Sequence, residues 1–111
     1  MRDWISQMRK GLIELCVLAV LADGGEAYGY QILQRLAQAE PLAVSESTVY
    51  PILARLAAEK LVHVRTAPSP AGPPRRYYRL TAAGSAHLKG LVEYWRSLRI
   101  AMDHLIMGGK S

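Results

Sequence analysis

SESTVYPILARLAAEK, residues 45–60, runs directly into LVHVRT, residues 61–66, and the spacing of the apolar side chains changes between the two. The first segment has a serine, Ser45 or Ser47, that can cap a helix, and then apolar residues at helical spacing. These apolar residues are Val49, Ile52, Leu53 and Leu56. The second segment alternates and is rich in β-branched residues, which is typical of a strand. We therefore expect a helix, with Lys60 at its end, that leads straight into a strand.

A second strand follows across a loop. Residues 67–74 hold four of the six prolines together with Gly72, a composition that predicts a loop. Residues 75–80 alternate again. Two short strands joined in this way predict a hairpin, with Arg75 and Arg76 at its tip.

Two helices are expected before this region. From Ile5 to Ala22 the chain is apolar at helical spacing and, in its last turns, on every side, which indicates a central buried helix. The glycines of Asp23-Gly24-Gly25 end it. Residues 28–39 predict a second helix with an apolar inner face, and Pro41 cannot continue it.

A long helix is expected to close the chain, over residues 82–107, with Thr81 as its cap. Its large apolar residues are spaced alternately three and four apart, a heptad pattern that suits packing of one helix on another. They are Leu88, Leu91, Trp95, Leu98, Met102 and Leu105. The alternative is that this helix packs only on its own domain. We favour a dimer seam, because so small a domain has little core with which to cover such a helix.

The order of elements predicts a mainly helical fold with a small β hairpin. Three helices followed by a two-stranded wing make a winged helix-turn-helix, to which the chain adds a long C-terminal dimerisation helix. We expect residues 1–81 to form the DNA-binding domain, residues 82–107 the dimerisation helix, and residues 108–111 a flexible tail.

Composition narrows the function. The chain has 14 Lys and Arg against 9 Asp and Glu, with a sequence pI near 9.7, which favours a polyanionic partner such as nucleic acid. No apolar run is long enough to cross a bilayer, Met1 to Gln7 do not resemble a signal peptide, and Cys16 is the single cysteine. We therefore expect a cytoplasmic protein without a membrane partner.

Catalysis is not expected. The three histidines are too widely spaced to share a metal ion on one helix face, and no glycine-rich phosphate loop or nucleophile elbow occurs. We expect no metal and no cofactor. The remaining alternative to a DNA-binding regulator is a winged-helix module that binds proteins and not DNA.

The predicted fold assigns DNA contacts to the third helix and the wing. A recognition helix reads base edges from its N-terminal part, and cationic wing residues suit phosphates or a narrow minor groove. The residues expected to point outward or to the flank are Ser47, Thr48, Tyr50, Pro51, Arg55, Arg75 and Arg76. The alternatives are that Tyr50 covers the edge of the core and that the wing arginines lie on a solvated loop.

Several segments resemble the PadR family of bacterial regulators, in its small subgroup with a single C-terminal helix. They are Arg9-Lys10-Gly11, Tyr28-Gly29-Tyr30, Ser47-Thr48-Val49-Tyr50-Pro51 with Leu53, and Arg76-Tyr77-Tyr78-Arg79-Leu80-Thr81 with Gly84. The resemblance implies a homodimer through the last and first helices, an inverted-repeat operator, and usually repression. It also implies that Tyr50 lies at the DNA face and that Tyr28 contacts phosphate. The proline-rich wing tip departs from the family pattern, which puts the reach of the wing in question.

The resemblance also implies an effector. In small members a tryptophan of the last helix lines a pocket between subunits that takes small aromatic or cationic molecules, and Trp95 occupies the matching position. Two symmetry-related indoles could sandwich a flat ligand. The expected apolar walls are Met8, Leu91, Leu98 and Met102. The alternative, that Trp95 is simply dimer core, stays open at this point.

Overall fold

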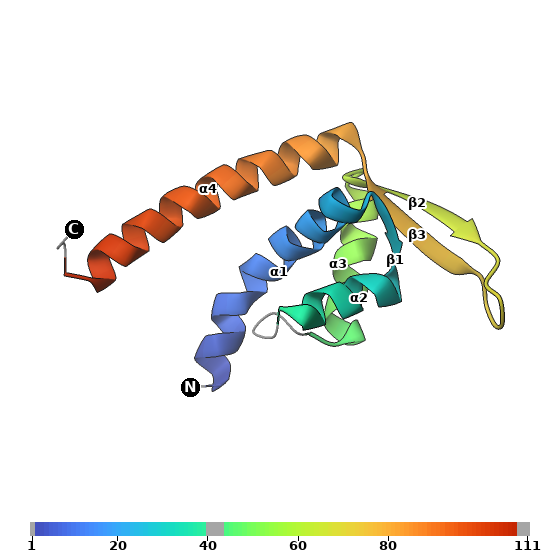
Figure 1. Ribbon diagram of the computed structural model, residues 1–111, viewed down its shortest axis with the longest axis horizontal. Coiled ribbons are helices and arrows are strands. Elements are labelled where there is room, and N and C mark those ends of the chain that lie inside the picture. Colours follow the sequence, from blue (N-terminus) through green and yellow to red (C-terminus); the bar gives the residue numbers. More distant parts are fainter. Residues whose placement is uncertain (1, 40–43, 109–111) are drawn as a thin grey trace.

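The computed structural model describes residues 2–39 and 44–108, and Figure 1 shows their arrangement. Three helices pack together on one side of a small sheet, and a fourth runs away from that sheet as a long arm. The elements are α1 (Arg2–Gly24), β1 (Glu26–Tyr28), α2 (Gly29–Gln38), α3 (Glu46–Ala58), β2 (Val62–Ala67), β3 (Arg75–Leu80) and α4 (Ala82–Ile106). The winged-helix fold predicted from the sequence is confirmed.

The core lies between α1, α2, α3 and the inner face of the sheet. Each helix contributes residues from one stripe, as the helical spacing predicts, and burying such side chains is the main favourable term in folding. The buried apolar residues are Ile13, Val17, Leu18, Leu21, Ala27, Ile32, Leu36, Val49, Leu53, Leu56, Val62 and Tyr78. This core fixes α3, so the exposed face of α3 has a defined direction.

The predicted two-stranded hairpin is present as β2 and β3, and a third strand that the sequence did not predict, β1, extends it into a three-stranded sheet. Its strand order is β1-β3-β2, and both neighbouring pairs are antiparallel. The added strand β1 is only three residues long, which is too short to show an alternation in the sequence. Tyr28, expected to open the second helix, is instead the last residue of β1 and the N-cap of α2.

The wing arginines do not lie at the tip of the hairpin, as the sequence had suggested. Arg75 pairs with Ala67 and Arg76 with Thr66, so both belong to the first rungs of the β2–β3 ladder. The tip consists of residues 68–74, which the prolines keep out of the ladder. A strand position holds these arginines far more rigidly than a solvated loop would.

Both ends of α3 differ in detail from the prediction. Ser45 is the N-cap residue, but its hydroxyl lies 2.7 Å from the hydroxyl of Ser47 and makes no capping bond to an amide. The helix ends at Ala58, and Lys60 follows it with a positive φ of 62°, beyond the last turn where a cation would complement the helix dipole. Pro41, expected to stop the second helix, lies outside the described residues.

The start of α4 is fastened to the start of β2. The predicted cap Thr81 is confirmed, because its hydroxyl accepts a hydrogen bond from the Gly84 amide at 3.0 Å. The same hydroxyl donates to the Lys60 carbonyl at 2.8 Å, and the Thr81 amide donates to the Leu61 carbonyl at 3.1 Å. Further along α4 only Leu88 and Leu91 pack against the core, and the helix is exposed from Glu93 onward. Of the tail predicted over residues 108–111, only Gly108 is described.

Candidate nucleic-acid interface

One exposed face of α3 carries uncharged side chains. Ser47, Tyr50, Pro51 and Ala54 are all exposed and recur three and four residues apart, so they lie on one face of the helix. Pro51 sits inside the helix and has no amide proton, so the Ser47 carbonyl lacks its usual intrahelical donor. Because this face is exposed, that carbonyl remains available to water or to a ligand.

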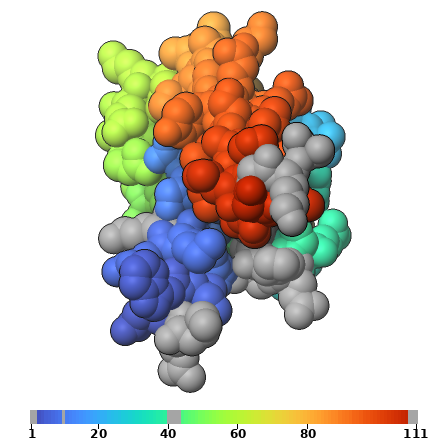
Figure 2. Space-filling view, turned by 90° about the vertical axis from the view of Figure 1, so that its left-hand side faces the viewer, coloured from blue at the N-terminus to red at the C-terminus, as the bar shows by residue number. Residues whose placement is uncertain are grey.

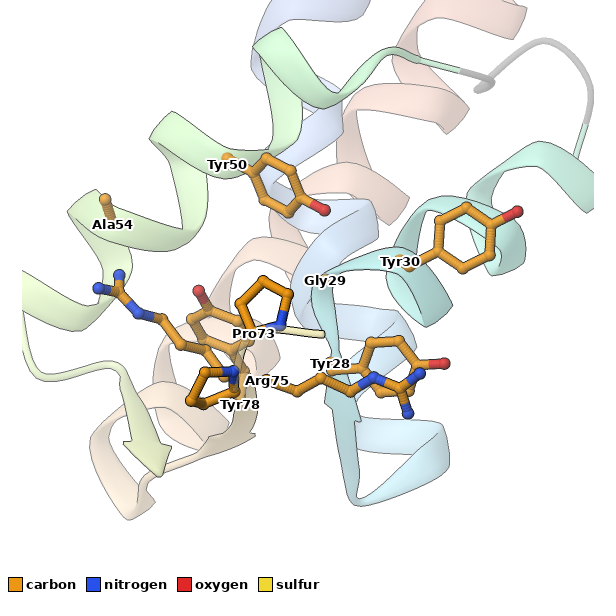
Figure 3. A pocket seen from close by; sticks show the side chains of 10 residues that line it. Tyr28, Gly29, Tyr30, Tyr50, Ala54, Pro73, Arg75 and Tyr78 are labelled. Atoms are coloured by element: carbon orange, nitrogen blue, oxygen red, sulfur yellow. The ribbon is translucent and has the colours of Figure 1, made fainter. Parts of the chain in front are cut away.

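A groove lies between this face of α3, the first turn of α2 and the part of the wing next to its tip. It has a volume of about 630 Å³ and is open to solvent. Figure 3 shows how the side chains converge on it from the three elements. The lining residues are Tyr28, Gly29, Tyr30, Tyr50, Ala54, Pro73, Pro74, Arg75, Arg76 and Tyr78. The groove therefore combines two arginines with four tyrosines and contains no carboxylate.

Arg75 is held against the ring of Tyr28. Its guanidinium carbon lies 4.3 Å from the ring centroid, a cation–π distance. In Figure 3 the Arg75 side chain extends from the wing to Tyr28 at the start of α2. The Tyr28 ring in turn meets Tyr77 edge-on, with centroids 5.5 Å apart. Arg75 is thus preorganised at the groove and loses little side-chain freedom if it binds an anion there.

A second arginine braces the wing behind the groove. Arg65 of β2 forms two hydrogen bonds of 2.8 Å with the carboxylate of Glu26 in β1, reaching across β3. Its guanidinium also lies 4.6 Å from the Tyr77 ring centroid. The hydrogen bonds from Arg65 lower the pKa of Glu26 below its ordinary value. This pair ties the two outer strands together, which helps to fix the direction of the wing.

Arg55 and Thr48 lie on a different side of α3 from Tyr50. They line a smaller pocket of about 380 Å³ that α3 shares with α1 and α4. Arg55 forms an ion pair with Glu14 of α1, and it also lies 3.5 Å from Glu59 one turn further along α3. Among the predicted DNA contacts, the structure brings Ser47, Tyr50, Pro51, Tyr28, Arg75 and Arg76 to one side, and it holds Arg55 to α1 at the flank.

Glu14 sits at the junction of three helices. Its carboxylate accepts a hydrogen bond from Arg55 of α3, and its other oxygen lies 3.2 Å from Nε2 of His87 in α4. Burial alone would raise the pKa of Glu14, but the hydrogen bonds and charges of Arg55 and His87 outweigh burial and lower the pKa below its ordinary value of 4.5. Glu14 therefore stays ionised and links α1, α3 and α4.

Tyr50 lies in the groove with its ring against the first turn of α2. The residue remains 40% exposed. Partial burial raises the pKa of the Tyr50 phenol, and nearby Glu46 and Tyr78 raise it further, so the hydroxyl is a neutral donor at physiological pH. Sequence reasoning did not assign Gly29, Tyr30 or Ala54 to the groove. For Ala54 the signal was present, because it lies four residues beyond Tyr50 and three beyond Pro51.

The residues predicted to line a dimer or ligand site lie on α1 and α4 and are not among those that line the groove; we call the exposed side of these two helices the apolar face. Figure 2 looks onto this face, where α4 (orange to red) and the N-terminal part of α1 (blue) are both exposed. Met8 is 73% exposed, Trp95 36%, Leu98 38% and Met102 44%, while Leu91 packs partly on the core. Large apolar side chains exposed together on two helices mark a surface suited to association.

The fold and groove are those of a winged-helix DNA-binding transcription regulator. Comparison with known proteins agrees: the model of the Transcriptional regulator PadR-like family matches residues 17–90. The chain belongs to the PadR-like family, whose members are transcriptional regulators and not enzymes. No helix in the described ranges 2–39 and 44–108 combines the length and the apolar character needed to cross a membrane.

Solved structures of this family resemble the chain over nearly its whole length. A PadR-like transcription factor from Bacteroides fragilis is 39% identical, covers 93% of this chain and 98% of its own, and superposes with a TM-score of 0.77. A PadR-like regulator from Bacillus cereus is 34% identical, with coverage of 91% and 97% and a TM-score of 0.79. A PadR family regulator from Eggerthella lenta is 27% identical, with coverage of 95% and 90% and a TM-score of 0.83.

Proposed function

We propose that this regulator represses transcription as a homodimer bound to an inverted-repeat operator. In each protomer the exposed face of α3 enters the major groove, and the part of the wing next to its tip contacts the neighbouring backbone. One observation carries the proposal: Tyr50 of α3 and Arg75 of the wing line the same carboxylate-free groove. Polar and aromatic side chains that can contact base edges then lie beside arginines that can bind phosphates.

The proposal gives each side chain a role that follows from its position. Arg75 and Arg76 bind phosphate oxygens, and Tyr28 supports Arg75 through its ring. Ser47, Tyr50 and Pro51 face the bases, where a hydroxyl can bond a base edge and a ring can cover a thymine methyl. We assign Arg55 and Thr48 to the flank, where the ion pair with Glu14 fixes the position of α3.

Dimerisation through α4 and α1 would place two recognition helices on one duplex. The exposed apolar side chains of α4 continue beyond Trp95 to its end, and Leu105 is 73% exposed. A helix with such a stripe is stabilised when a second copy covers it. Two half-sites on one face of DNA lie about 34 Å apart, so the seam would set the spacing of the inverted repeat. In this proposal residues 1–81 bind DNA and residues 82–107 pair the protomers.

DNA binding is tested with a duplex that the purified protein selects from a random-sequence library. We expect its affinity to fall by orders of magnitude between about 50 and about 200 mM salt, because phosphate contacts release counterions. Replacing Arg75 and Arg76 with alanine should weaken binding and flatten this salt dependence. Arg79→Ala is the matched control, since Arg79 is exposed on the same strand but does not line the groove. Equal effects of the two changes would contradict the proposed interface.

Repression itself is tested in a promoter–reporter strain. DNA upstream of the regulator's own gene is the first fragment to footprint, because small regulators often control themselves. We expect protection of an inverted repeat and lower reporter output when the regulator is present. Higher output would make the protein an activator.

A ligand between the subunits is a second proposed function of the apolar face. Trp95 and Met102 are partly exposed on the α4 stripe, and paired indoles at such a seam can hold a flat aromatic or cationic molecule. Binding there would change the angle between the two α4 helices and relieve repression by a shift in population. The test is to titrate a planar aromatic cation, acridine orange, against tryptophan fluorescence. Identical quenching of the wild type and Trp95→Ala would leave Trp95 as dimer core only.

A further inference from the structure

The first residue of α2, Gly29, is buried directly beneath the ring of Tyr50. A Cβ atom at position 29 would lie 2.3 Å from Cε1 of Tyr50 and 3.1 Å from both Cζ and the hydroxyl oxygen. Figure 3 shows the Tyr50 ring extending from α3 towards Gly29. The ring can occupy this place only because position 29 has no side chain.

The backbone gives no other reason for glycine at this position. In the described part of the chain the glycines with positive φ are Gly25, Gly72 and Gly108, so Gly29 has a conformation that any residue can adopt. Alanine is also favoured over glycine within a helix. The need for glycine is therefore one of space, and the atoms that occupy that space belong to Tyr50.

We propose that Gly29 is a positioning residue for operator recognition, because its bare backbone seats the ring of Tyr50 and so fixes how this side chain meets DNA. The inference rests on the proposed function, in which Tyr50 faces the bases. The ring is held on one side by α2 and remains exposed on the other, so its hydroxyl and its open face have a defined direction before DNA arrives. A side chain ordered in advance avoids the entropy cost of ordering on binding.

The clash that alanine would create can be relieved by moving Tyr50. The atoms met by the new methyl lie at the far end of the Tyr50 side chain, which can rotate about its χ1 bond. The Gly29→Ala protein should therefore fold, with the Tyr50 ring displaced from its seat. This makes the variant a usable probe of DNA binding.

The experiment is a double-mutant cycle with Gly29→Ala, Tyr50→Ala and the double variant. Affinity is measured for the duplex selected by the wild type and for a scrambled duplex of the same composition. In the wild-type background we expect Gly29→Ala to weaken binding of the selected duplex about tenfold, the cost of releasing one ordered side chain. In the Tyr50→Ala background the same change should have no effect, because no ring remains to be displaced. Binding of the scrambled duplex should change little in either background.

The outcomes separate this inference from the proposed function. If the wild type does not distinguish the selected from the scrambled duplex, sequence-specific DNA binding fails and the inference fails with it. If the wild type does distinguish them, but Gly29→Ala is neutral or weakens binding equally in both backgrounds, the inference alone is overturned. An equal loss would mean that position 29 acts through the stability of α2 or its own contact with DNA. Circular dichroism of each variant checks that the helices are retained.

Discussion

Replacing Gly84 with alanine should separate α4 from the wing, and the structure allows the size of the effect to be worked out. A Cβ atom at position 84 would lie 1.9 Å from the carbonyl oxygen of Leu61 and 2.9 Å from its carbonyl carbon. A Cβ atom at position 29 would meet a side-chain ring, whereas these are backbone atoms of the residue just before β2. No side-chain rotation can relieve the contact, so α4 itself has to move.

The required movement of α4 is large for the tightly packed contact between the start of α4 and Leu61. The methyl and the carbonyl oxygen have to separate by about 1.5 Å before their contact becomes ordinary. That shift strains the hydrogen bonds from Thr81 to the Lys60 and Leu61 carbonyls, each worth about 1 kcal/mol. Overpacking of this kind costs a further 1–3 kcal/mol, roughly. We expect a total destabilisation of about 3 kcal/mol and a Tm lower by about 10 °C.

The change in Tm caused by Gly84→Ala is measured by thermal unfolding followed by circular dichroism. The protein concentration is kept fixed, because the Tm of a dimer depends on it. Gly90→Ala is the matched control: Gly90 lies in the same helix, off the apolar stripe, and a Cβ there meets nothing within 4 Å. That change should stabilise the protein by about 0.5–1 kcal/mol through helix propensity alone. If Gly84→Ala and Gly90→Ala shift the Tm equally, the close contact with Leu61 does not exist in solution.

Three further predictions concern an acidic residue, a ring that supports an arginine, and the dimer seam. Because the pKa of Glu14 is lowered, ionised Glu14 stabilises the fold at neutral pH, and this stabilisation is lost as the pH falls through the lowered pKa. Urea unfolding at a series of pH values should therefore show a smaller drop in the free energy of unfolding at acid pH for Glu14→Gln than for the wild type. Tyr28→Phe should keep the affinity for selected DNA, whereas Tyr28→Ala should weaken it and add nothing to Arg75→Ala, a coupling that binding titrations will detect. Leu98→Glu with Met102→Glu should convert dimers into folded monomers by light scattering; an unchanged mass would place the seam elsewhere.

Sequence patterns predicted the elements of the fold because those patterns are local. Val49, Leu53 and Leu56 repeat with a helical period, and all three are buried in the described core. After Lys60 the side chains alternate with a period of two, and this change predicted the bounds of β2 to within one residue. The cap at Thr81 was also predictable, since a hydroxyl at that position bonds an amide three residues away.

The features that sequence reasoning missed depend on contacts between distant segments. Glu26 and Arg65 are 39 residues apart, and only the pairing of both outer strands with β3 brings them together. The ion pair between Glu14 and Arg55 likewise requires α1 to pack on α3. Spacing within α3 predicted that Arg55 points outward or to the flank, but it could not show that a carboxylate from α1 holds the side chain at the flank.

The short strand β1 explains why the groove can act as one rigid unit. Tyr28 ends β1 and also caps α2, so the strand that pairs with the wing is continuous with the helix that seats Tyr50. Arg75 stacks on the same Tyr28 ring, which fastens the wing cation to this connection. A two-stranded wing would be hinged to the helices only through α3 and α4. With β1 in the sheet, α2 and the wing cannot separate without breaking the β1–β3 ladder, so Tyr50 and Arg75 keep a fixed spacing. In the proposed complex the DNA has to match that spacing.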